Sequence, residues 1–555
     1  MAAWAMGLAV WGLCVSSVWG AAPTLTHLFP AGGERGTKVT VTCSGTFNWP
    51  PSVWSPGVDV TPTAESGKLE VSIPADLAAD RIWIRLYNAE GASALAPFLI
   101  GSLPELAEVE PNNSPKTAQK IDSPRVTING ALGDGDVDGF AVALEAGQTL
   151  VAAVDAHTRL GSPMDAILQV ATSNGTVLAE NHDDLKLDPR LAFTPRTAGT
   201  YIVRLFAFSA APNSTIAFQG GANFIYRLTL TTGPYVTHAA AQAAPRADPG
   251  TVGAAGWNLP ADLKLPVVSW GGARLAEFQE FEVLDELRRS PDARLGLVFD
   301  PALAGAARVR LGPYATAPPL SAADPQQPAT LTLPTALTGC LKQPRQTDTY
   351  RLPLTKGQPV IISVESRSLD LPIDPVVQLT DPNGAVVADL DDTGPHRDAL
   401  IAHTAAHDGD YRLTITDRYR HGTERYVYLL TVRLEEADFE LSATADAIVV
   451  NPDKPTELTI KVQRRGTAAS AMGPITIQAV GLPKGVTAPP VVSEPTGPTA
   501  AEVKLQLSST GAAYSGPVQV QGQASQPRAL ERFARTPARL GVAFETIWLT
   551  SIGKP

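Results

Sequence analysis

Two stretches of the chain carry the same short motifs in the same order. Residues 126–151 contain VTINGAL, DVDGF and LEAGQ, and residues 335–358 contain TALTGCL, TDTY and LTKGQ at matching places. An Asn-Gly pair, an Asp-Asp pair and a Gly-x-Tyr triplet follow both stretches in the same order. Such ordered self-similarity indicates a duplicated structural unit, and it limits the fold to an array of similar domains.

The segments that precede the two copies also resemble each other. The pair Thr-His stands at 26–27 and 237–238, and residues 74–86 resemble residues 301–311. The duplicated unit therefore consists of a leading and a trailing domain, and a chain of 555 residues is too long for one hydrophobic core. We expect a signal peptide over 1–20 and domains over 21–103, 104–232, 233–331, 332–436 and 437–555.

Alternation of apolar and polar residues predicts strands in these domains. In residues 140–144 the larger apolar side chains occupy every second position, and residues 201–205 and 411–415 behave alike. Turns rich in glycine separate the runs, and the 48 prolines and 46 glycines interrupt helices. Residues 275–289 are a helix candidate that also permits a short strand. The sequence thus predicts an all-β chain, a tandem array of antiparallel β-sandwiches.

The first twenty residues are apolar and uncharged. Val18 and Gly20 supply small residues before a cleavage point, so we interpret 1–20 as a signal peptide. No Lys or Arg precedes the apolar run, and an uncleaved anchor helix is the alternative. We expect no membrane span in the mature chain and a location in the periplasm, at the cell surface or outside the cell.

Charge and cysteine content exclude other classes of protein. The net charge of −11 leaves no basic face for nucleic acid. Cleavage would leave Cys43 and Cys340, which fall in different predicted domains, so free thiols are expected rather than a disulfide.

An acidic segment precedes the first copy and continues to its first long strand. Residues 108–113 read EVEPNN and residues 134–140 read DGDVDGF. The stretch from Asp134 to Glu145 matches the spacing of an EF-hand loop, but residues 140–144 alternate as a strand, which excludes the helices that an EF-hand needs.

Residues 108–232 resemble the bacterial pre-peptidase C-terminal domain. The motifs EPNN, DVDGF, EAGQ, NHDD and AGTY support this resemblance, and residues 332–434 resemble a diverged second copy. The family implies a compact, jelly-roll-like β-sandwich of exported bacterial proteins, one that often accompanies peptidases. Relatives in clostridial collagenases bind collagen and calcium. Residues 23–101, 233–331 and 438–555 resemble Ig-like domains more weakly.

The resemblance implies a calcium site in the first copy. Carried over by motif, the metal ligands are Glu108, Glu110, Asn112, Asn113, Asp136 and Asp138, with Asp134 as a further candidate. The alternative is a set of solvated turn residues in an Asx-capped linker. The second copy lacks the upstream acids and keeps only Asp348, so we expect no metal there.

Other residues of chemical interest have simpler explanations. The pairs Asp183-Asp184 and Asp391-Asp392 are typical of turns. His403 and His407 have a helical metal-ligand spacing, yet they fall on a predicted strand and the turn after it. Three tryptophans could form carbohydrate platforms, although packing explains them better; they are Trp49, Trp54 and Trp257. No nucleophile elbow, phosphate loop or Cys-His constellation is present in the sequence.

These observations lead to a prediction of function. We expect an exported, non-enzymatic binding or adhesion protein whose calcium ion stiffens residues 104–113. Its partner would be an extracellular polymer, a surface or another exported protein. The alternatives are an accessory subunit of a secreted peptidase or glycan hydrolase, or a hydrolase whose site the sequence does not reveal.

Overall fold

The protein is described from a computed structural model that covers residues 21–211, 217–269, 280–282, 294–313, 327–393, 398–466 and 472–554. The expected signal peptide lies outside these residues. Within them the only helices are α1 (His157–Leu160) and the 3-10 turn η2 (Arg367–Leu369), and strands form nearly all other regular structure. The predicted all-β class is confirmed.

Five large apolar clusters divide the described chain into modules. We number these modules by their cores, which span Leu25–Ile100 (module 1), Ile121–Leu230 (module 2), Val236–Leu311 (module 3), Leu331–Val432 (module 4) and Ala437–Leu549 (module 5). Alternating strand residues point into these cores, as in β13 (Asp138–Leu144), where Phe140, Val142 and Leu144 are buried.

Module 1 packs two sheets face to face. The first has the order β1 (His27–Phe29), β3 (Lys38–Ser44), β6 (Lys68–Ser72), β5 (Asp59–Pro62). The second has the order β2 (Gly32–Glu34), β9 (Ala96–Gly101), β7 (Arg81–Asn88), β4 (Ser52–Trp54), and β8 (Gly91–Ala92) pairs with β7. Their facing side chains form the first core.

Modules 2 and 4 repeat one topology strand for strand. Module 2 has the sheets β10 (Glu105–Ala107), β12 (Arg125–Ala131), β19 (Ile225–Thr231), β14 (Leu150–Asp155), β17 (Arg190–Phe193) and β11 (Gln119–Ile121), β13, β18 (Gly199–Ser209), β15 (Met164–Thr172), β16 (Val177–Asn181). Module 4 has the sheets β29 (Thr335–Cys340), β36 (Val427–Leu434), β31 (Pro359–Glu365), β34 (Ala399–Thr404) and β28 (Ala329–Thr330), β30 (Asp348–Leu354), β35 (Gly409–Asp417), β32 (Pro375–Thr380), β33 (Val386–Leu390). Among the described strands, only β10 lacks a counterpart in module 4, which agrees with the duplication seen in the sequence.

Module 3 contains one long sheet. Its order is β21 (Ala243–Pro245), β27 (Ala307–Gly312), β25 (Arg294–Val298), β23 (Lys264–Ser269), β22 (Thr251–Trp257), β20 (Tyr235–Ala239), β26 (Ala304–Gly305). β21 pairs in parallel with β27 as β2 pairs with β9, so β27 corresponds to β9. The sequence match of residues 74–86 with residues 301–311 aligns β27 with β7. The strand pairing shows that β27 corresponds to β9 instead.

Module 5 is the largest sheet system. Its main path runs β38 (Ala447–Val450), β47 (Ile547–Ser551), β44 (Tyr514–Ala524), β45 (Leu530–Arg535), β37 (Asp438–Ala443), β39 (Thr456–Arg465), β43 (Glu502–Ser509), β41 (Val486–Thr487). β40 (Ile475–Val480) joins β44 to β42 (Val491–Ser493). β46 (Val542–Phe544) pairs with β24 (Glu280–Glu282), so the described part of the helix candidate 275–289 is a strand.

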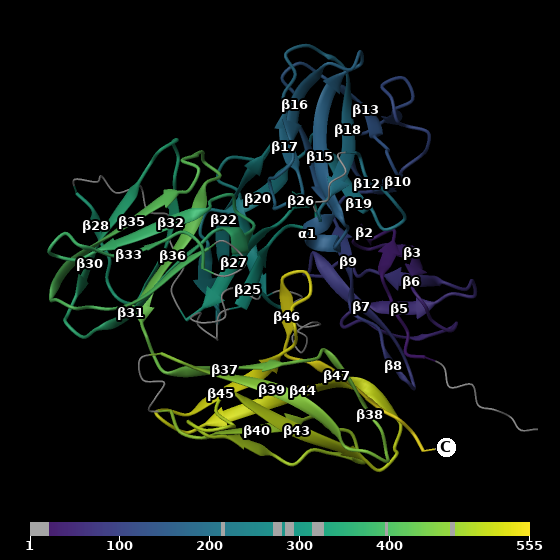
Figure 1. Ribbon diagram of the computed structural model, residues 1–555. Coiled ribbons are helices and arrows are strands. Elements are labelled where there is room, and N and C mark those ends of the chain that lie inside the picture. Colours follow the sequence, from purple (N-terminus) through teal and green to yellow (C-terminus); the bar gives the residue numbers. More distant parts are fainter. Residues whose placement is uncertain are drawn as a thin grey trace, which may run out of the picture.

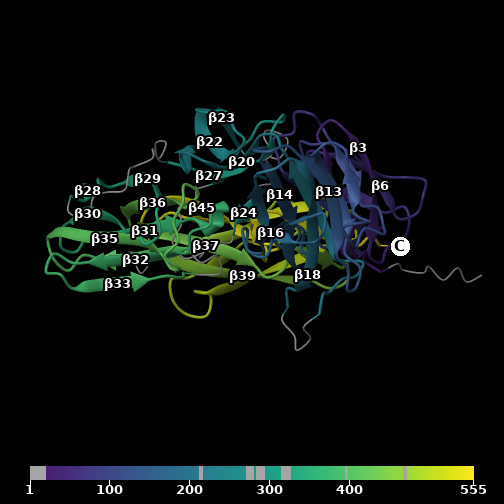
Figure 2. The same ribbon diagram turned by 90° about the horizontal axis from the view of Figure 1, so that it is seen from above.

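The five modules close on one another (Figure 1). Both views place modules 1 and 4 at opposite ends, with module 3 between them (Figure 2). Module 5 also contacts module 1, where Asp446 forms an ion pair with the buried Arg85 at 2.7 Å. At the same interface the rings of Trp54 and Trp548 lie 5.5 Å apart and those of Trp83 and Phe544 lie 5.4 Å apart. The chain is thus a closed assembly.

Buried ion pairs join the other modules. Arg159 of module 2 meets Asp80 of module 1 at 2.6 Å, and Arg310 of module 3 meets Glu365 of module 4 at 2.6 Å. Such pairs hold geometry well, because removal of one partner leaves a buried charge without compensation.

Two other expectations can be compared with the described residues. Cys43 and Cys340 are free thiols, as predicted. Among the helices that the structure describes, none has the length and apolar character that a membrane crossing requires.

Candidate metal centre

Three carboxylates meet at the edge of module 2. The carboxylate oxygens of Glu108, Glu110 and Asp138 lie within 4.8 Å of one another. The two glutamates belong to the segment between β10, which pairs with β12 in one sheet, and β11, which pairs with β13 in the other. Asp138 is the first residue of β13. The site therefore lies where the chain crosses between the two sheets of the sandwich.

Asp138 is the innermost of the three and is 0 % exposed. Its Oδ2 accepts a short hydrogen bond from the hydroxyl of Tyr226, a buried residue of β19. Its Oδ1 is also buried, and no donor among the described residues reaches it. A buried carboxylate oxygen without a partner is costly, so a bound cation, or a proton shared with the neighbouring Glu108, would stabilise it.

Glu108 is fixed against the same tyrosine. Its Oε2 accepts a hydrogen bond from the Ala131 backbone at 2.9 Å and lies 2.8 Å from the Tyr226 hydroxyl, whose single proton it shares with Asp138. The close approach requires a glycine at 130, because a Cβ there would lie 1.9 Å from Glu108 Oε2 and 2.3 Å from the Tyr226 hydroxyl. Tyr226 therefore contacts both carboxylates, and it reaches them past Gly130 of β12, which has no side chain.

The crowding of negative charge shifts the titration of both acids. Burial raises the pKa of Asp138 to about 8, and the neighbouring Glu108 adds to the rise. Burial likewise raises the pKa of Glu108 to about 6, against the opposing hydrogen bonds from Tyr226 and Ala131. Without a cation the chain favours protonated acids here. A divalent ion would favour the charged forms instead, and calcium prefers such hard oxygen ligands.

The remaining candidates of the predicted ligand set lie beside this group. Asn112 is buried, and its Oδ1 accepts from the Gly139 backbone at 3.1 Å, so it orders the turn. Asn113 donates a short hydrogen bond to Asp136, which stands outside the three-carboxylate group. Asp134 is exposed in the turn before Asp136. The structure therefore brings together Glu108, Glu110 and Asp138, and ligand roles for the others stay predictions.

Module 4 shows how the same position is satisfied without a metal. Asp348, the counterpart of Asp138, accepts from Tyr428 at 2.6 Å through Oδ2, as Asp138 accepts from Tyr226. Its Oδ1, however, accepts at 2.8 Å from the amide of Gln346. Gln346 stands two residues before Asp348, where module 2 has Asp136. A neutral donor thus completes the module 4 site, whereas in module 2 the residue at the position of Gln346 is the acidic Asp136.

The paired aspartates serve structural roles. Asp184 is largely buried and bridges Arg190 at 2.7 Å and Arg425 of module 4 at 2.9 Å. Asp183 is exposed beside His182, and Asp391 pairs with an arginine on the surface.

The histidine and tryptophan candidates also lie in structural positions. His403 lies on β34, the predicted strand. Trp49 packs on the core of module 1, Trp54 on the interface with module 5, and Trp257 beside Tyr235 at the boundary of modules 2 and 3. Packing therefore explains these three tryptophans in the described structure.

Sequence reasoning missed Tyr226 as part of the site. The signal was available, since Tyr226 and Tyr428 recur in matching motifs of the two copies. What the sequence does not give is that a strand 88 residues downstream of Asp138 places this hydroxyl between two carboxylates.

Comparisons with known proteins find similar solved structures but no family. Neither a protein-family profile nor a curated protein sequence matches the chain. The pre-peptidase C-terminal domain of a Bacillus anthracis collagenase is similar over 20% of this chain and 98% of that one, with 21% identity and a TM-score of 0.16. A secreted protein of Eubacterium rectale is similar over 41% of this chain and 79% of that one, with 9% identity and a TM-score of 0.18.

Fibronectin type III-like modules of Clostridium thermocellum CbhA are similar over 36% of this chain and 88% of theirs, with 13% identity and a TM-score of 0.12. None of the similarities assigns an activity or a ligand to the chain.

Proposed function

We propose that the chain is an exported, non-catalytic binding or adhesion protein in which a calcium ion stiffens residues 104–113. The observation that carries the calcium assignment is the fully buried, unpartnered Oδ1 of Asp138 beside Glu108 and Glu110. The contrast with Asp348, whose equivalent oxygen bonds to Gln346, supports it. The partner would be an extracellular polymer, a surface or another exported protein.

The chain's own residues explain what the ion would stabilise. Glu105, at the start of the segment, already bonds to Arg227 and Asn129, so its upstream end is held to the sandwich. The downstream part carries Glu108 and Glu110, which would repel an ionised Asp138. A bound cation supplies the opposite charge there and turns this repulsion into attraction. Residues 104–113 would then be fixed along their whole length.

Edge strands support the binding role. β16 and β33 end their sheets at matching places in modules 2 and 4. Val177 and Leu178 on β16 are 42% and 46% exposed, and Val386 on β33 is 54% exposed. A sheet edge with exposed apolar side chains offers both backbone hydrogen bonds and side-chain contacts to an extended partner. The closed assembly would hold these two edges in fixed relative positions.

A matched pair of variants tests the calcium assignment. In Asp138→Asn the central charge is lost, and calcium should no longer raise the melting temperature of chelator-treated protein. In Asp348→Asn the chemical change is the same in the module that needs no metal, and the calcium response should persist. Limited proteolysis near Asn112 should follow the same pattern. Equal responses in the wild type and Asp138→Asn, or none in the wild type, would exclude the assignment.

Two assays test the remainder of the proposal. A binding array of extracellular polymers and surfaces, probed with and without calcium, should identify a ligand. Incubation of the purified protein with casein and common polysaccharides should release no products. Catalytic turnover of any of these substrates would replace the binding role with a hydrolase.

A further inference from the structure

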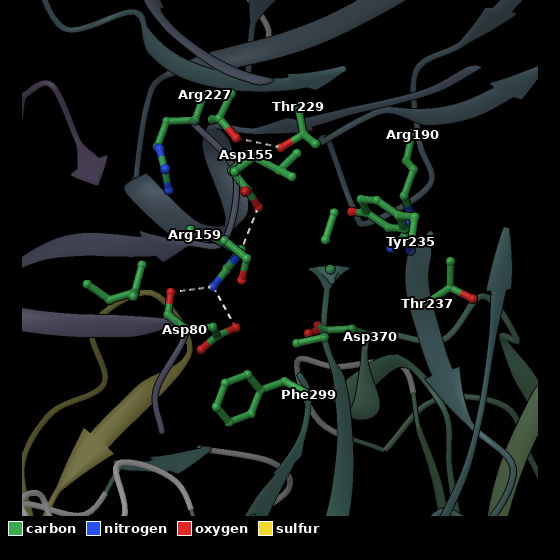
Figure 3. Close-up of a pocket in the computed structure, with 18 of the residues that line it drawn as sticks. Asp80, Asp155, Arg159, Arg190, Arg227, Thr229, Tyr235, Thr237, Phe299 and Asp370 are labelled. Carbon is green, nitrogen blue, oxygen red and sulfur yellow. Dashed lines mark hydrogen bonds and ion pairs between the residues drawn. The ribbon is translucent and has the colours of Figure 1, made fainter. Parts of the chain in front are cut away.

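A cavity lies where modules 1 to 4 meet (Figure 3). Its volume is about 120 Å³. At about 10–15 Å³ for each water-sized position, it has room for about ten non-hydrogen atoms. Module 1 contributes Arg35, module 2 Arg159, module 3 Tyr235 and module 4 Asp370. A ligand there would touch four modules at once.

Positive charge predominates on the lining. Five arginines line the cavity, namely Arg35, Arg159, Arg190, Arg227 and Arg308, against three aspartates, namely Asp80, Asp155 and Asp370. Two of the arginines have carboxylate partners outside the lining: Arg227 bonds to Glu105, and Arg190 shares Asp184 with Arg425. Because Asp184 serves two arginines, these outside partners do not balance the charge.

Arg35 shows the excess most clearly. Its guanidinium donates to the backbone carbonyls of Leu77, Ala79 and Gly101 and to the Ser102 hydroxyl, and among the described residues it donates to no carboxylate. It also lies 4.7 Å from the ring centroid of Phe299. Burial lowers its pKa to about 10; Asp80 opposes this shift, and the nearby arginines add to it. The charged form is therefore held at a cost that an anion would relieve.

Guanidinium groups supply the hydrogen-bond donors of the lining, since each carries several N–H groups and no acceptor. Guanidinium donors of this kind match the oxygen atoms of a carboxylate.

Acidic and hydroxyl groups are interspersed with the arginines. Figure 3 shows Arg159 with Asp80 and Asp155 on one side of the cavity and Arg190 beside Tyr235 on the other, and Asp370 pairs with Arg308 at 3.1 Å. Thr229 and Thr237 add hydroxyl groups, and Phe299 closes the lower side with an aromatic face. Carboxylates accept hydrogen bonds from the hydroxyl groups of a ligand, and protein hydroxyls can both donate to them and accept from them.

We propose that this cavity binds a small hydroxylated carboxylate. The ligand class follows from the excess of arginines over aspartates on the lining, the hydroxyl groups of Thr229, Tyr235 and Thr237 among them, and the limited volume. Because it bridges four modules, such a ligand ties their relative positions together. Arg227 connects this site to the start of residues 104–113 through Glu105, but neither proposal requires the other.

The test uses the full chain and a matched pair of probes. Erythronate, a four-carbon hydroxy acid, should raise the melting temperature and bind in calorimetry, whereas erythritol, the neutral polyol of nearly the same size, should not. Equal binding of both compounds, or binding of neither, would overturn the proposal. Binding of inorganic phosphate without binding of erythronate would overturn the ligand class.

Two variants test whether the ligand binds in this cavity and whether a negative charge on the lining weakens its binding. Ala306→Leu fills the cavity from its lining without removing a charge, and it should abolish erythronate binding while the protein still melts cooperatively. Asp370→Asn removes a negative charge from the wall, and Asn is compatible with the left-handed backbone at 370 (φ 61°).

Asp370→Asn should therefore tighten erythronate binding on the order of tenfold. The exposed Asp453→Asn, which lies in module 5, is the matched control and should leave binding unchanged. Weaker binding in Asp370→Asn, or unchanged binding in Ala306→Leu, would place the ligand elsewhere.

Discussion

The acidic centre predicts that metal-free protein loses stability as the pH rises. Burial and the neighbouring Glu108 raise the pKa of Asp138 to about 8, against about 3.9 for an aspartate in an unfolded chain. Between these values the native state holds a proton that the unfolded state has lost. The stabilisation is therefore complete below the unfolded pKa and disappears as the pH rises through the folded one.

The magnitude follows from the proton count. One extra native-state proton lowers the free energy of unfolding by about 1.4 kcal/mol for each pH unit, so a rise from pH 5.5 to 7.5 should cost about 3 kcal/mol. Glu108, whose pKa is raised to about 6, acts with the same sign at the lower end of this range. Calcium displaces these protons, so its stabilising effect should be larger at pH 7.5 than at pH 5.5.

The assay is denaturant unfolding of chelator-treated protein at several pH values, for the wild type and Asp138→Asn. The difference between the two isolates the site, because Asp188, whose pKa burial raises to about 7, contributes a slope of the same sign in both proteins. A difference that does not change with pH would refute the reasoning. So would a calcium effect that is larger at pH 5.5 than at pH 7.5.

Two further predictions concern the interfaces between modules. Asp184→Asn leaves two partly buried arginines without their shared carboxylate and should lower the free energy of unfolding by about 3 kcal/mol in chemical denaturation, whereas the exposed neighbour Asp183→Asn should change little. Phe544→Ala removes the ring that packs on Trp83 and should cost about 3–5 kcal/mol. Small-angle scattering should then show a larger radius of gyration, which Leu434→Ala, at a 47% exposed position, should not cause.

The sequence was sufficient for the features that depend on local patterns. Period-two alternation predicts β13 and β18, and the ordered motifs predict that modules 2 and 4 share a topology. The acidic motifs include all three members of the carboxylate group, Glu108, Glu110 and Asp138. In each case the decisive residues are close in sequence or recur at corresponding places in the two copies.

Features that depend on distant pairings were beyond such reasoning. Arg85 and Asp446 are separated by 361 positions, and no periodicity connects them. The same limit applies to the cavity, whose lining comes from four modules. An arginine or a tryptophan in a sequence does not reveal whether it faces water or another module, because that depends on how whole domains dock.

The contact between module 5 and module 1 changes what a single break in the polypeptide would do. In a linear string of domains, a protease that cuts one linker releases everything beyond it. Here each module has neighbours other than those that its linkers supply, through pairs such as Arg85–Asp446 and Asp184–Arg425. A nicked molecule would therefore stay in one piece until a second cut or a denaturant separated the fragments.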